Sequence, residues 1–524
     1  MKRVAVSVVL RDAAKLESFV QHTQRWSLPS SEFELWLAIF GSDLDTGYER
    51  ASEAESGIHL RTVENEAEAH NAHLAQTQVP LFLILDDSVD LGVDTITQLV
   101  SEADHASQDV VAFECAQSEM AREKIFHPLN GETPWSALSC VLFRTHALRK
   151  VGGLDARLDR PCRDMDLSFR LRACGWTLRY YEEITVNATE PAQSVPKPAD
   201  QLVLRLRYGH KLDLLRFLLG RLPESGSWYS RIRAACQVAP RGRRSKLVGK
   251  KIDLTSAGLV RLKADAPAIE DGPMVSIVVR THGERQMLLA EALTTLQRQT
   301  YRNLEIVVVE DGSRLAENTV IACSGPAQVA YYPVPKQGRS RCGNYGLAVA
   351  KGAYLGFLDD DDLLYSDHIA SLVAVLEKGE FAAYSVGLEV GTLWISGHEY
   401  RECQWMVRYR KAFDRRKLQI ENFLPIQTVL FRRELYERLG GFDEELDQLE
   451  DWNLWARYGW VADFRFVDRI TSLYRVPFDP HLKASRQVGL DSAYRNAHQR
   501  NLNFQSKYAP GAFMEPGLSI MLNH

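Results

Sequence analysis

Four consecutive aspartates are the residues of this chain whose type and spacing point most directly to chemistry. Asp359–Asp362 directly follow the apolar run Tyr354–Leu358. A buried strand that ends in carboxylates presents them at the carboxyl edge of a sheet, where open α/β folds bind ligands. Carboxylates this close repel one another unless a cation lies among them, and Mg²⁺ or Mn²⁺ held by carboxylates and substrate phosphates would meet that need. The alternative interpretation is a solvent-exposed acidic turn.

Composition limits the classes of protein to which the chain can belong. Its 524 residues exceed what one hydrophobic core supports, so we expect at least two domains. The net charge of −5 argues against nucleic acid as an obligate partner. The first residues lead directly into a strand pattern rather than a signal peptide, and we expect no membrane-spanning segment. Eight scattered cysteines indicate reduced thiols in a cytoplasm, without a zinc site or disulfide framework.

The elements that would position the aspartates alternate along the second half of the chain. Apolar runs at 275–279, 304–309 and 354–358 predict buried strands, and helical periodicity predicts helices at about 284–299 and 340–350. Strands that alternate with helices indicate a parallel sheet with right-handed crossovers.

The first half of the chain repeats this plan. Strand patterns at 4–9, 34–39 and 81–85 match the three above, and Asp86-Asp87 follows the third. Equivalent positions lie 271 apart at Glu34 and Glu305, and 273 apart at Asp86 and Asp359. The separation drifts only by loop-sized insertions, so we interpret the chain as a duplication.

The region between the repeats has a different character. Leu202–Leu222 has the pattern of an amphipathic helix, and residues 231–251 hold eight basic residues and no acidic one. The segment 201–251 could bind an anionic membrane surface; the favoured alternative is an inter-domain helix packed on a neighbouring sheet. The predicted domains are therefore 1–190, a basic and largely helical linker at 191–270, and 271–524 with a C-terminal helical extension.

Six segments together carry a resemblance to a known family. They are Val275–Thr281, Gln299–Ser313, Gly338–Asn344, Phe357–Asp362, Gly440–Glu444 and Glu450–Trp452. In combination they resemble the family-2 glycosyltransferases, which have the GT-A fold, over about 274–476. The first half resembles a degenerate copy of the same fold. The resemblance implies an α/β protein with two tandem GT-A domains, each Rossmann-like with a mostly parallel sheet.

The resemblance also implies a site for a nucleotide-sugar donor. In the family, the acid after the second strand contacts the base and an Asp-x-Asp motif binds ribose and a divalent cation, Mn²⁺ or Mg²⁺. Gly343 stands where the family usually has an arginine, so Arg339 or Arg341 would supply charge to the diphosphate. The implied donor-binding residues are Thr281, His282, Asp311, Arg339, Arg341, Asn344, Asp359 and Asp360. The implied metal ligands are Asp359 and Asp361, with His481 as a third ligand or a lone surface histidine.

The acidic pair Glu450-Asp451 resembles the family's catalytic pair beside the acceptor. Asp451 would act as a general base on an acceptor hydroxyl, which attacks the anomeric carbon directly and inverts its configuration. A structural helix cap is the alternative, because carboxylates are favoured in a first helical turn. Trp452 would stack on an acceptor sugar or lie in the core.

The first copy lacks most of these groups. Aligning the repeats places Leu10, Phe40, Glu68 and Ser88 opposite Thr281, Asp311, Arg341 and Asp361. Asp164 aligns with Asp451, and its neighbours Arg163 and Arg170 suggest a structural ion pair. We therefore expect one active domain with a degenerate partner that serves acceptor capture or homo-oligomer formation.

The predicted function is inverting, metal-dependent transfer of a sugar from a nucleoside diphosphate, UDP or dTDP favoured. The acceptor would be a glycan, a lipid-linked glycan or a protein, in bacterial-type surface glycan or glycoprotein synthesis. Two alternatives stay open: a glycan polymerase in which both domains are active, and a non-catalytic carbohydrate-binding scaffold. A sugar nucleotidyltransferase is disfavoured, because neither half contains the Gly-x-Gly-Thr-Arg-Leu loop of that class.

Overall fold

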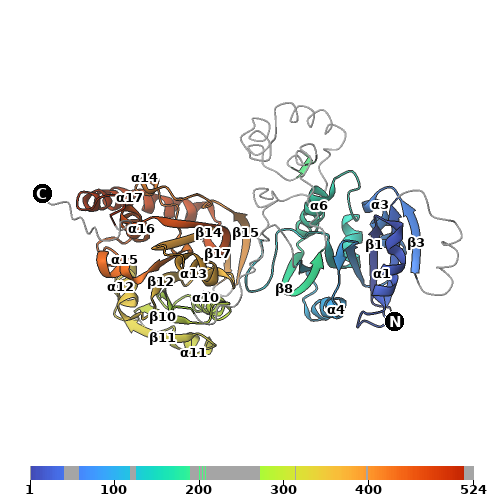
Figure 1. The fold of residues 1–524 in the computed structure, drawn as a ribbon, viewed down its shortest axis with the longest axis horizontal. Helices are drawn as coiled ribbons and strands as arrows, with labels where there is room; N and C mark the ends of the chain where they lie inside the picture. Colours follow the sequence, from blue (N-terminus) through green and yellow to red (C-terminus); the bar gives the residue numbers. More distant parts are fainter. Residues whose placement is uncertain are drawn as a thin grey trace, which may run out of the picture. The chain divides into compact units, whose positions relative to one another are not determined.

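The computed structural model divides into two compact units, Met1–Lys263 and Ala264–His524, called here the N-terminal and C-terminal domains (Figure 1). Each is an α/β domain built on one curled, mostly parallel sheet, which confirms the predicted fold class. The residues that the structure describes are 2–40, 58–117, 125–188, 200, 203–204, 207, 272–312, 314–396 and 399–512.

The N-terminal sheet contains eight strands, and among the described residues two helices cover one face and three cover the other. In spatial order the strands are β3 (Ile58–Val63), β2 (Phe33–Phe40), β1 (Val4–Leu10), β4 (Leu81–Asp86), β7 (Cys140–Arg144), β6 (Val110–Gln117), β8 (Thr177–Ala188) and β5 (Val89–Asp90). The core on one face includes residues of α1 (Leu16–Thr23) and α4 (Thr95–His105). The core on the other includes residues of α3 (Glu66–Gln76), α5 (Thr145–Val151) and α6 (Arg160–Ala173).

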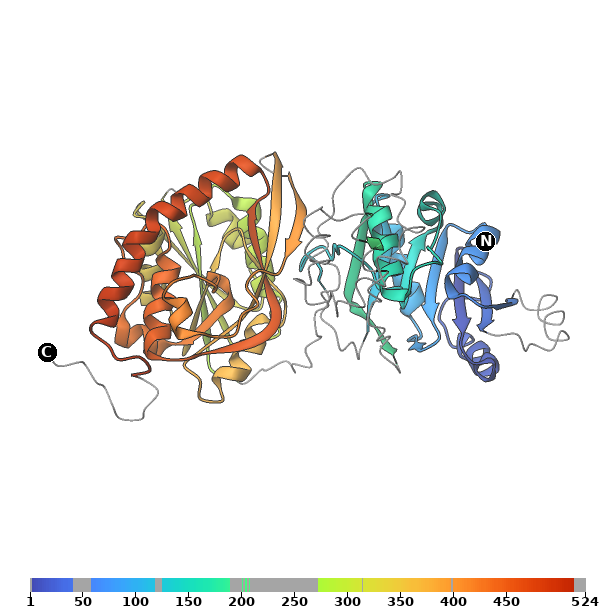
Figure 2. The same ribbon diagram turned by 90° about the horizontal axis from the view of Figure 1, so that it is seen from above.

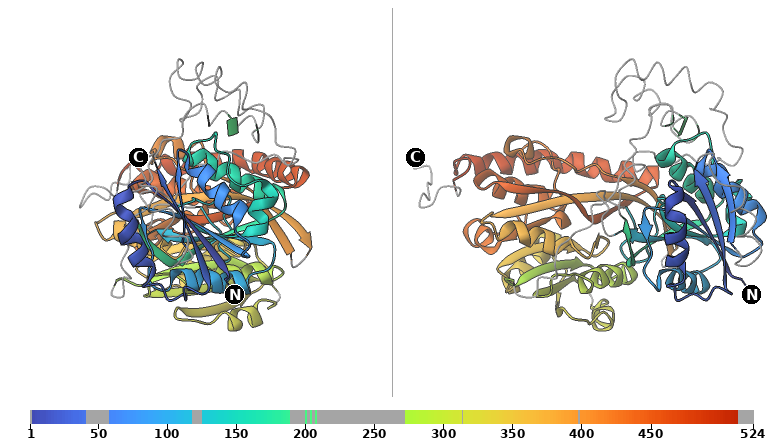
Figure 3. Two further views of the ribbon diagram at one scale, coloured as in Figure 1. Left: turned by 90° about the vertical axis from the view of Figure 1, so that its right-hand side faces the viewer. Right: turned by 45° about the vertical axis from the view of Figure 1, so that its right-hand side comes forward.

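The C-terminal sheet has nine strands. In spatial order they are β11 (Gln328–Val334), β10 (Leu304–Asp311), β9 (Val275–Thr281), β12 (Tyr354–Asp359), β16 (Val429–Arg432), β14 (Ala382–Ser396), β17 (Phe464–Pro477) and β13 (Leu363–Leu364), while β15 (Glu399–Met406) pairs with β14. Both sheets show the usual strand twist in Figure 3.

Helices cover both faces of the C-terminal sheet. One face packs against α10 (Gln286–Gln297), α11 (Glu317–Ala322) and α13 (His368–Leu376). The other packs against α12 (Arg339–Val349), α15 (Arg433–Leu439) and α16 (Glu450–Val461). The short α14 (Arg415–Leu418) contacts α16, and the long α17 (Pro480–Gln505) also packs on α16 along the outside of this domain (Figure 2).

The central strands are mostly apolar because both of their faces are covered. In β9, Val275, Ile277 and Val279 point into the core that contains α10, while Val278 points into the core that contains α12. This alternation follows from the two-residue period of a strand, and near-continuous apolar runs are typical of parallel strands buried on both sides.

The two sheets have the same topology and the same strand register. Val4 lies opposite Phe33 and Val275 opposite Leu304, so equivalent strand pairs are offset by the same number of residues. The antiparallel pairs agree as well, since Leu81 faces Arg144 and Tyr354 faces Arg432. This agreement, strand by strand, confirms the predicted tandem arrangement.

Most of the predicted linker lies outside the described residues. The described part includes Asp200 and Arg207, which bind the N-terminal domain: Asp200 Oδ2 accepts a hydrogen bond from the Asp159 amide, and Arg207 pairs with Asp155 and Asp166 at 2.7 Å. Within the described residues, no helix has the length and apolar character needed to cross a membrane.

Candidate active site

The predicted acidic residues meet in one cavity of the C-terminal domain. Parallel pairing of β12 with β9 places Asp359 opposite Arg280 at the carboxyl edge of the sheet. The cavity has a volume of about 460 Å³, and its walls come from β9, β12, β17 and the starts of α12, α16 and α17. The predicted site residues that line it are Arg339, Asp359, Asp361, Glu450 and Asp451.

Arg280 links the two acidic groups of the cavity. Its guanidinium binds both oxygens of Asp359, at 2.8 and 3.0 Å, and donates to Glu450 Oε1 at 3.0 Å. Burial alone would raise the pKa of Asp359, but Arg280 and two further arginines outweigh that effect and lower it. Arg280 was not among the predicted site residues; the signal for it was a basic residue near the end of an otherwise apolar strand.

A second arginine holds the next two aspartates. Arg285 binds Asp361 Oδ2 and Asp360 Oδ1, each at 2.5 Å. Thr281 Oγ1 donates to the other oxygen of Asp360 at 2.6 Å. Asp360 is fully buried and does not line the cavity, and burial raises its pKa to about 7. Thr281 and Asp360 therefore stabilise the acidic turn, Asp359–Asp362, from its buried side.

The donor set of the cavity fits a divalent cation that also binds substrate phosphates. The carboxylates of Asp359 and Asp361 line the cavity and are 27% and 29% exposed. Two carboxylates completed by phosphate oxygens are a usual arrangement for Mg²⁺ or Mn²⁺. Among the described residues, no group of three His, Cys, Asp or Glu side chains could hold a metal ion. His481 is exposed at the start of α17 and does not line the cavity, so the predicted third ligand is not brought to the acids.

The pair Glu450-Asp451 begins α16. The residue before it, Leu449, has φ +61, a left-handed conformation that is unfavourable for a leucine and typical of functional sites. Glu450 is buried against Arg280, whereas Asp451 faces the cavity, where its Oδ2 accepts a hydrogen bond from Asn422 at 3.0 Å. Burial, followed by the nearby Glu450 charge, raises the pKa of Asp451 to about 6.

The prediction that Trp452 contacts the acceptor is wrong. Its side chain is only 1% exposed, its indole N–H donates to the Leu418 carbonyl at 2.6 Å, and its ring stacks on Tyr494 of α17 at 5.1 Å. The tryptophan belongs to the core that attaches α17 to α16.

Asp311 and His282 lie outside the cavity walls. The Asp311 carboxylate accepts hydrogen bonds from the amides of Gln337 and Gly338, at 2.6 and 3.2 Å, and so fixes the turn before α12. His282 is half-buried after β9, 3.9 Å from Glu284. Their contacts with a nucleotide base stay predictions.

Asn344 has a structural role that both copies share. Its amide group donates to the Phe442 carbonyl at 3.1 Å and accepts from the Phe442 amide at 2.7 Å. In the first copy, Asn71 makes the same two bonds to Leu154, at 2.8 and 2.7 Å. The predicted donor contact of Asn344 is therefore replaced by an inter-element bridge.

Glycine is required beside this bridge. A Cβ atom on Gly153 or Gly441 would lie 2.2 Å from the asparagine oxygen in either domain. Arg341, in turn, is half-exposed and binds Glu444 at 3.2 Å outside the cavity, so the structure does not bring it to the acids either.

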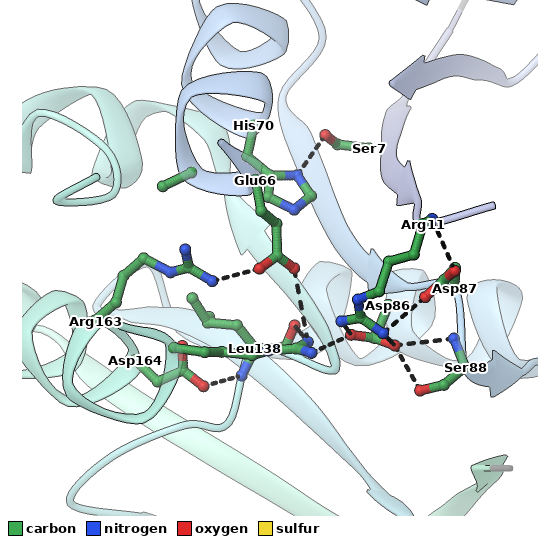
Figure 4. A network of polar contacts seen from close by, with 12 residues as sticks. Ser7, Arg11, Glu66, His70, Asp86, Asp87, Ser88, Leu138, Arg163 and Asp164 are labelled. Carbon is green, nitrogen blue, oxygen red and sulfur yellow. Dashed lines mark hydrogen bonds and ion pairs between the residues drawn. The ribbon is translucent and has the colours of Figure 1, made fainter. Parts of the chain in front are cut away.

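The equivalent site of the N-terminal domain is filled by its own arginines (Figure 4). Asp86, the counterpart of Asp359, accepts hydrogen bonds from Arg11, from Arg160 and from the Ser88 amide. Burial would raise the pKa of Asp86, but Arg160 and these other partners lower it. Asp87 is paired with Arg11 as well, at 2.9 Å.

One ion pair of the site has opposite polarity in the two domains. Arg339 lies 3.7 Å from Glu450 in the C-terminal domain. The aligned residues of the first copy are Glu66 and Arg163, which pair at 2.7 Å. Helix α6 also begins earlier than α16 in the alignment, and its first residue, Arg160, reaches Asp86.

The prediction that Asp164 forms an ion pair with Arg163 or Arg170 is wrong. Asp164 is buried and accepts a hydrogen bond from the Leu138 amide at 3.1 Å, while Arg163 binds Glu66 and Arg170 binds Asp166. Burial raises the pKa of Asp164 to about 6 despite the nearby Arg160 and Arg163.

Comparison with protein families places a known domain in the second half of the chain. Residues 276–440 match the family model described as glycosyl transferase family 2. An uncharacterized glycosyltransferase of Rickettsia typhi is 29% identical over 210 residues, 39% of this chain and 64% of the relative. The chain thus spans less than two thirds of that relative's length.

Other relatives cover shorter or more divergent stretches. The GalNAc(5)-diNAcBac-PP-undecaprenol beta-1,3-glucosyltransferase of Campylobacter jejuni is 33% identical over 111 residues, 20% of this chain and 36% of that protein. Among solved structures, TarS 1–349 of S. aureus matches with a TM-score of 0.33 and 16% identity, covering 44% of this chain and 71% of that one.

Proposed function

We propose that the C-terminal domain, whose residues 276–440 match the model of glycosyl transferase family 2, transfers a sugar from a nucleoside diphosphate to an acceptor hydroxyl, with inversion. The observation that carries this proposal is the shared cavity. Asp359 and Asp361, suited to a cation and a diphosphate, line the same 460 Å³ cavity as Asp451, a carboxylate whose pKa of about 6 suits a general base.

The catalytic role of Asp451 follows from its position and protonation. Near neutral pH the carboxylate is ionised, and Asn422 and the Trp452 amide hold its two oxygens. It would take the proton of the acceptor hydroxyl as that oxygen attacks the anomeric carbon from the face opposite the diphosphate. Direct displacement inverts the configuration.

The opposite side of the cavity would stabilise the leaving group. Asp359 and Asp361 would hold a divalent cation, Mn²⁺ or Mg²⁺, which when bound supplies Lewis-acid stabilisation to the departing diphosphate. Arg339, half-exposed at the start of α12, would contact a phosphate oxygen. Arg280 holds Asp359 and Glu450 in place and favours the ionised form of Asp359.

The donor and acceptor are proposed only as classes. We favour a UDP or dTDP sugar, with Asp311 and His282 near the base, and a glycan, lipid-linked glycan or protein as acceptor. A role in surface glycan synthesis is consistent with the name of the Campylobacter jejuni relative, which acts on an undecaprenol-linked glycan.

We propose that the N-terminal domain does not turn over a donor. Arg11, Arg160 and Lys15 neutralise its two aspartates, and Ser88 replaces the carboxylate that aligns with Asp361. A polymerase with two active domains would need a donor site that does not use these acids.

We also propose a cytoplasmic location with contact to a membrane surface through the basic segment 201–251, most of which lies outside the described residues. Flotation with anionic liposomes at low salt measures this, and protein that stays in the bottom fraction contradicts it.

A panel of nucleotide sugars with Mn²⁺ tests the catalytic proposal through the release of nucleoside diphosphate. We expect Asp361→Ala and Asp451→Asn to lower kcat/KM by at least about 10²-fold, the size of effect usual for a general base or an electrostatic stabiliser. Asp164→Asn, the matched change in the first copy, should leave turnover unchanged. Activity that survives the first two changes, or that is lost with the third, contradicts the assignment.

A further inference from the structure

Three side chains form a wall of the cavity that the proposed mechanism does not use. They are Tyr409, which follows β15, Tyr474 of β17 and Arg486 of α17, and all three line the cavity. The two tyrosine rings meet edge to face at 6.2 Å. The Arg486 guanidinium lies 5.4 Å from the centre of the Tyr474 ring and donates a hydrogen bond to its hydroxyl. We call these three residues the Tyr–Arg wall.

The Tyr–Arg wall lies beside the proposed base. Burial, together with nearby carboxylates that include Asp451, raises the pKa of Tyr409 to about 12. Asp451 also contributes to the raised pKa of Tyr474, after burial and after the carboxylate of Asp362. Both phenols are therefore neutral and near Asp451, where an acceptor sugar must place its attacking hydroxyl. Aromatic rings offer such a sugar an apolar face and a polar edge.

Arg486 differs from the other arginines of the cavity. Arg280 and Arg285 each bind two carboxylates, and Arg475 binds Glu291 at 2.8 Å. Even Arg339 lies within 3.7 Å of Glu450. Within the described parts of the chain, Arg486 forms no ion pair or hydrogen bond with a carboxylate.

The hydrogen-bond partner of Arg486 is the neutral hydroxyl of Tyr474. A guanidinium carries five N–H donors in a fixed planar arrangement, and most of those of Arg486 are left for a ligand. Stacking on Tyr474 keeps the group in one orientation. A planar cation oriented in this way matches a carboxylate or phosphate, which it can bind through two parallel hydrogen bonds.

We propose that the Tyr–Arg wall binds the acceptor, and that the acceptor carries an anionic group, a carboxylate or a phosphate, close to the hydroxyl that attacks. The inference rests on the proposed function of the same cavity. The donor diphosphate has separate partners in the acidic turn and Arg339, on the side where α12 begins. Arg486 comes from α17, an element separate from α12 and from the acidic turn, and it lines the same cavity as Asp451. We therefore assign it to the acceptor rather than the donor.

Binding of matched sugars to the full chain tests the proposal without depending on turnover. Asp451→Asn protein, saturated with UDP and Mn²⁺, is titrated with methyl glucoside, its 6-phosphate and methyl glucuronide in a calorimeter. We expect the two anionic sugars to bind at least about tenfold more tightly than the neutral one, as one charge-assisted contact provides. Adding Arg486→Gln should remove this difference and leave the neutral sugar unaffected.

Two further variants separate the specific contact from general charge. Lys483→Gln removes a positive charge from an exposed position of the same helix, outside the cavity, and should change nothing. Arg486→Glu should reverse the preference towards methyl glucosaminide, a cationic sugar.

Three results would overturn the inference. One is anionic sugars that bind no better than the neutral sugar, or sugars that do not bind at all. Another is a preference that Arg486→Gln leaves intact. The last is a loss of UDP affinity in Arg486→Gln, which would assign the arginine to the donor diphosphate. Donor hydrolysis by protein with wild-type Asp451 reports the proposed function separately, so its failure is distinguishable from failure of acceptor selection.

Discussion

Asp451 sits at the start of a helix, where a carboxylate could serve either catalysis or stability. Its pKa of about 6 distinguishes the two roles, because burial and Glu450 disfavour the charged form that a stabilising cap requires. A carboxylate whose surroundings disfavour its charged form is characteristic of a functional site.

The raised pKa predicts a specific pH dependence. The base form is required, so kcat/KM should fall as the pH drops through about 6. Since the folded-state pKa lies above the unfolded value, the native state binds the extra proton between about pH 4 and 6, and stability is lost as the pH rises through this range. Asp451→Asn should therefore raise the free energy of unfolding at pH 8, by about 1 kcal/mol. Thermal unfolding at pH 8 and pH 4 measures this.

A purely structural cap gives the opposite result. Asp451→Asn would then lower stability at pH 8, as loss of a helix-capping charge does. Asp164→Asn is the comparison within the same chain, because burial raises that pKa to about 6 as well while Asp164 makes no contribution to turnover in our proposal.

At this scale the sequence indicated which acids would meet in the cavity but not which arginines would bind them. Asp359, Asp361 and Asp451 stand out because a core does not require carboxylates directly after a buried strand or at the start of a buried helix. Arg280 leaves only the signal of a basic residue in a mostly apolar strand, and Arg285 leaves none, because their partners are 79 and 76 residues away and only the fold brings them together. Trp452 was misassigned because its burial depends on α17, a helix whose packing no motif specifies.

At the scale of elements, the duplicated asparagine bridge explains why a glycine, Gly441 or Gly153, directly precedes Phe442 and Leu154. Asn344 and Asn71 connect the helix before the acidic strands to the turn before α16 or α6. The bridge connects α12 to the Gly-Gly turn before α16. It therefore also fixes the starts of α12 and α16, which carry Arg339 and Glu450.

Replacing either asparagine should destabilise its own domain. Asn344→Ala and Asn71→Ala each remove the two bonds of the bridge and leave a half-buried backbone amide unpaired, a loss of about 2 kcal/mol. Asn344→Ala also removes an exposed hydrogen bond to Glu444. Calorimetric unfolding should show the lower transition in the domain that carries the change. A contact with the donor predicts instead that Asn344→Ala raises the donor KM without changing stability, and that Asn71→Ala has no effect.

Three strands of each sheet could be predicted because each is an apolar run followed by a polar turn, twice over. A C-terminal helical extension was also expected, but its packing could not be predicted, since α17 has no apolar stripe of its own; the contact between Tyr494 and Trp452 is one of those that hold it. That helix provides Arg486, so the acceptor side of the cavity was also missing from the sequence prediction.

At the scale of the whole molecule, two copies of one fold carry one proposed metal site. In the first copy Ser88 stands where the C-terminal domain has the carboxylate of Asp361, and Arg11 and Arg160 both bind the one aligned carboxylate, Asp86. We therefore predict one Mn²⁺ per chain in the presence of UDP, measured by electron paramagnetic resonance of the free ion. Asp361→Ala should abolish this binding, and Asp87→Asn should not change it. Two ions per chain would contradict the proposal that only the C-terminal domain binds a metal ion.

The opposite polarity of the Arg339–Glu450 and Glu66–Arg163 pairs has an evolutionary consequence. From either arrangement, a single substitution towards the other places two like charges face to face in a partly buried position. A return therefore passes through an intermediate that folds less well, and both changes would have to occur almost together. Once the two halves had diverged at this pair, losing an active site required fewer changes than regaining a second one. The exchange of charges therefore makes the loss difficult to reverse.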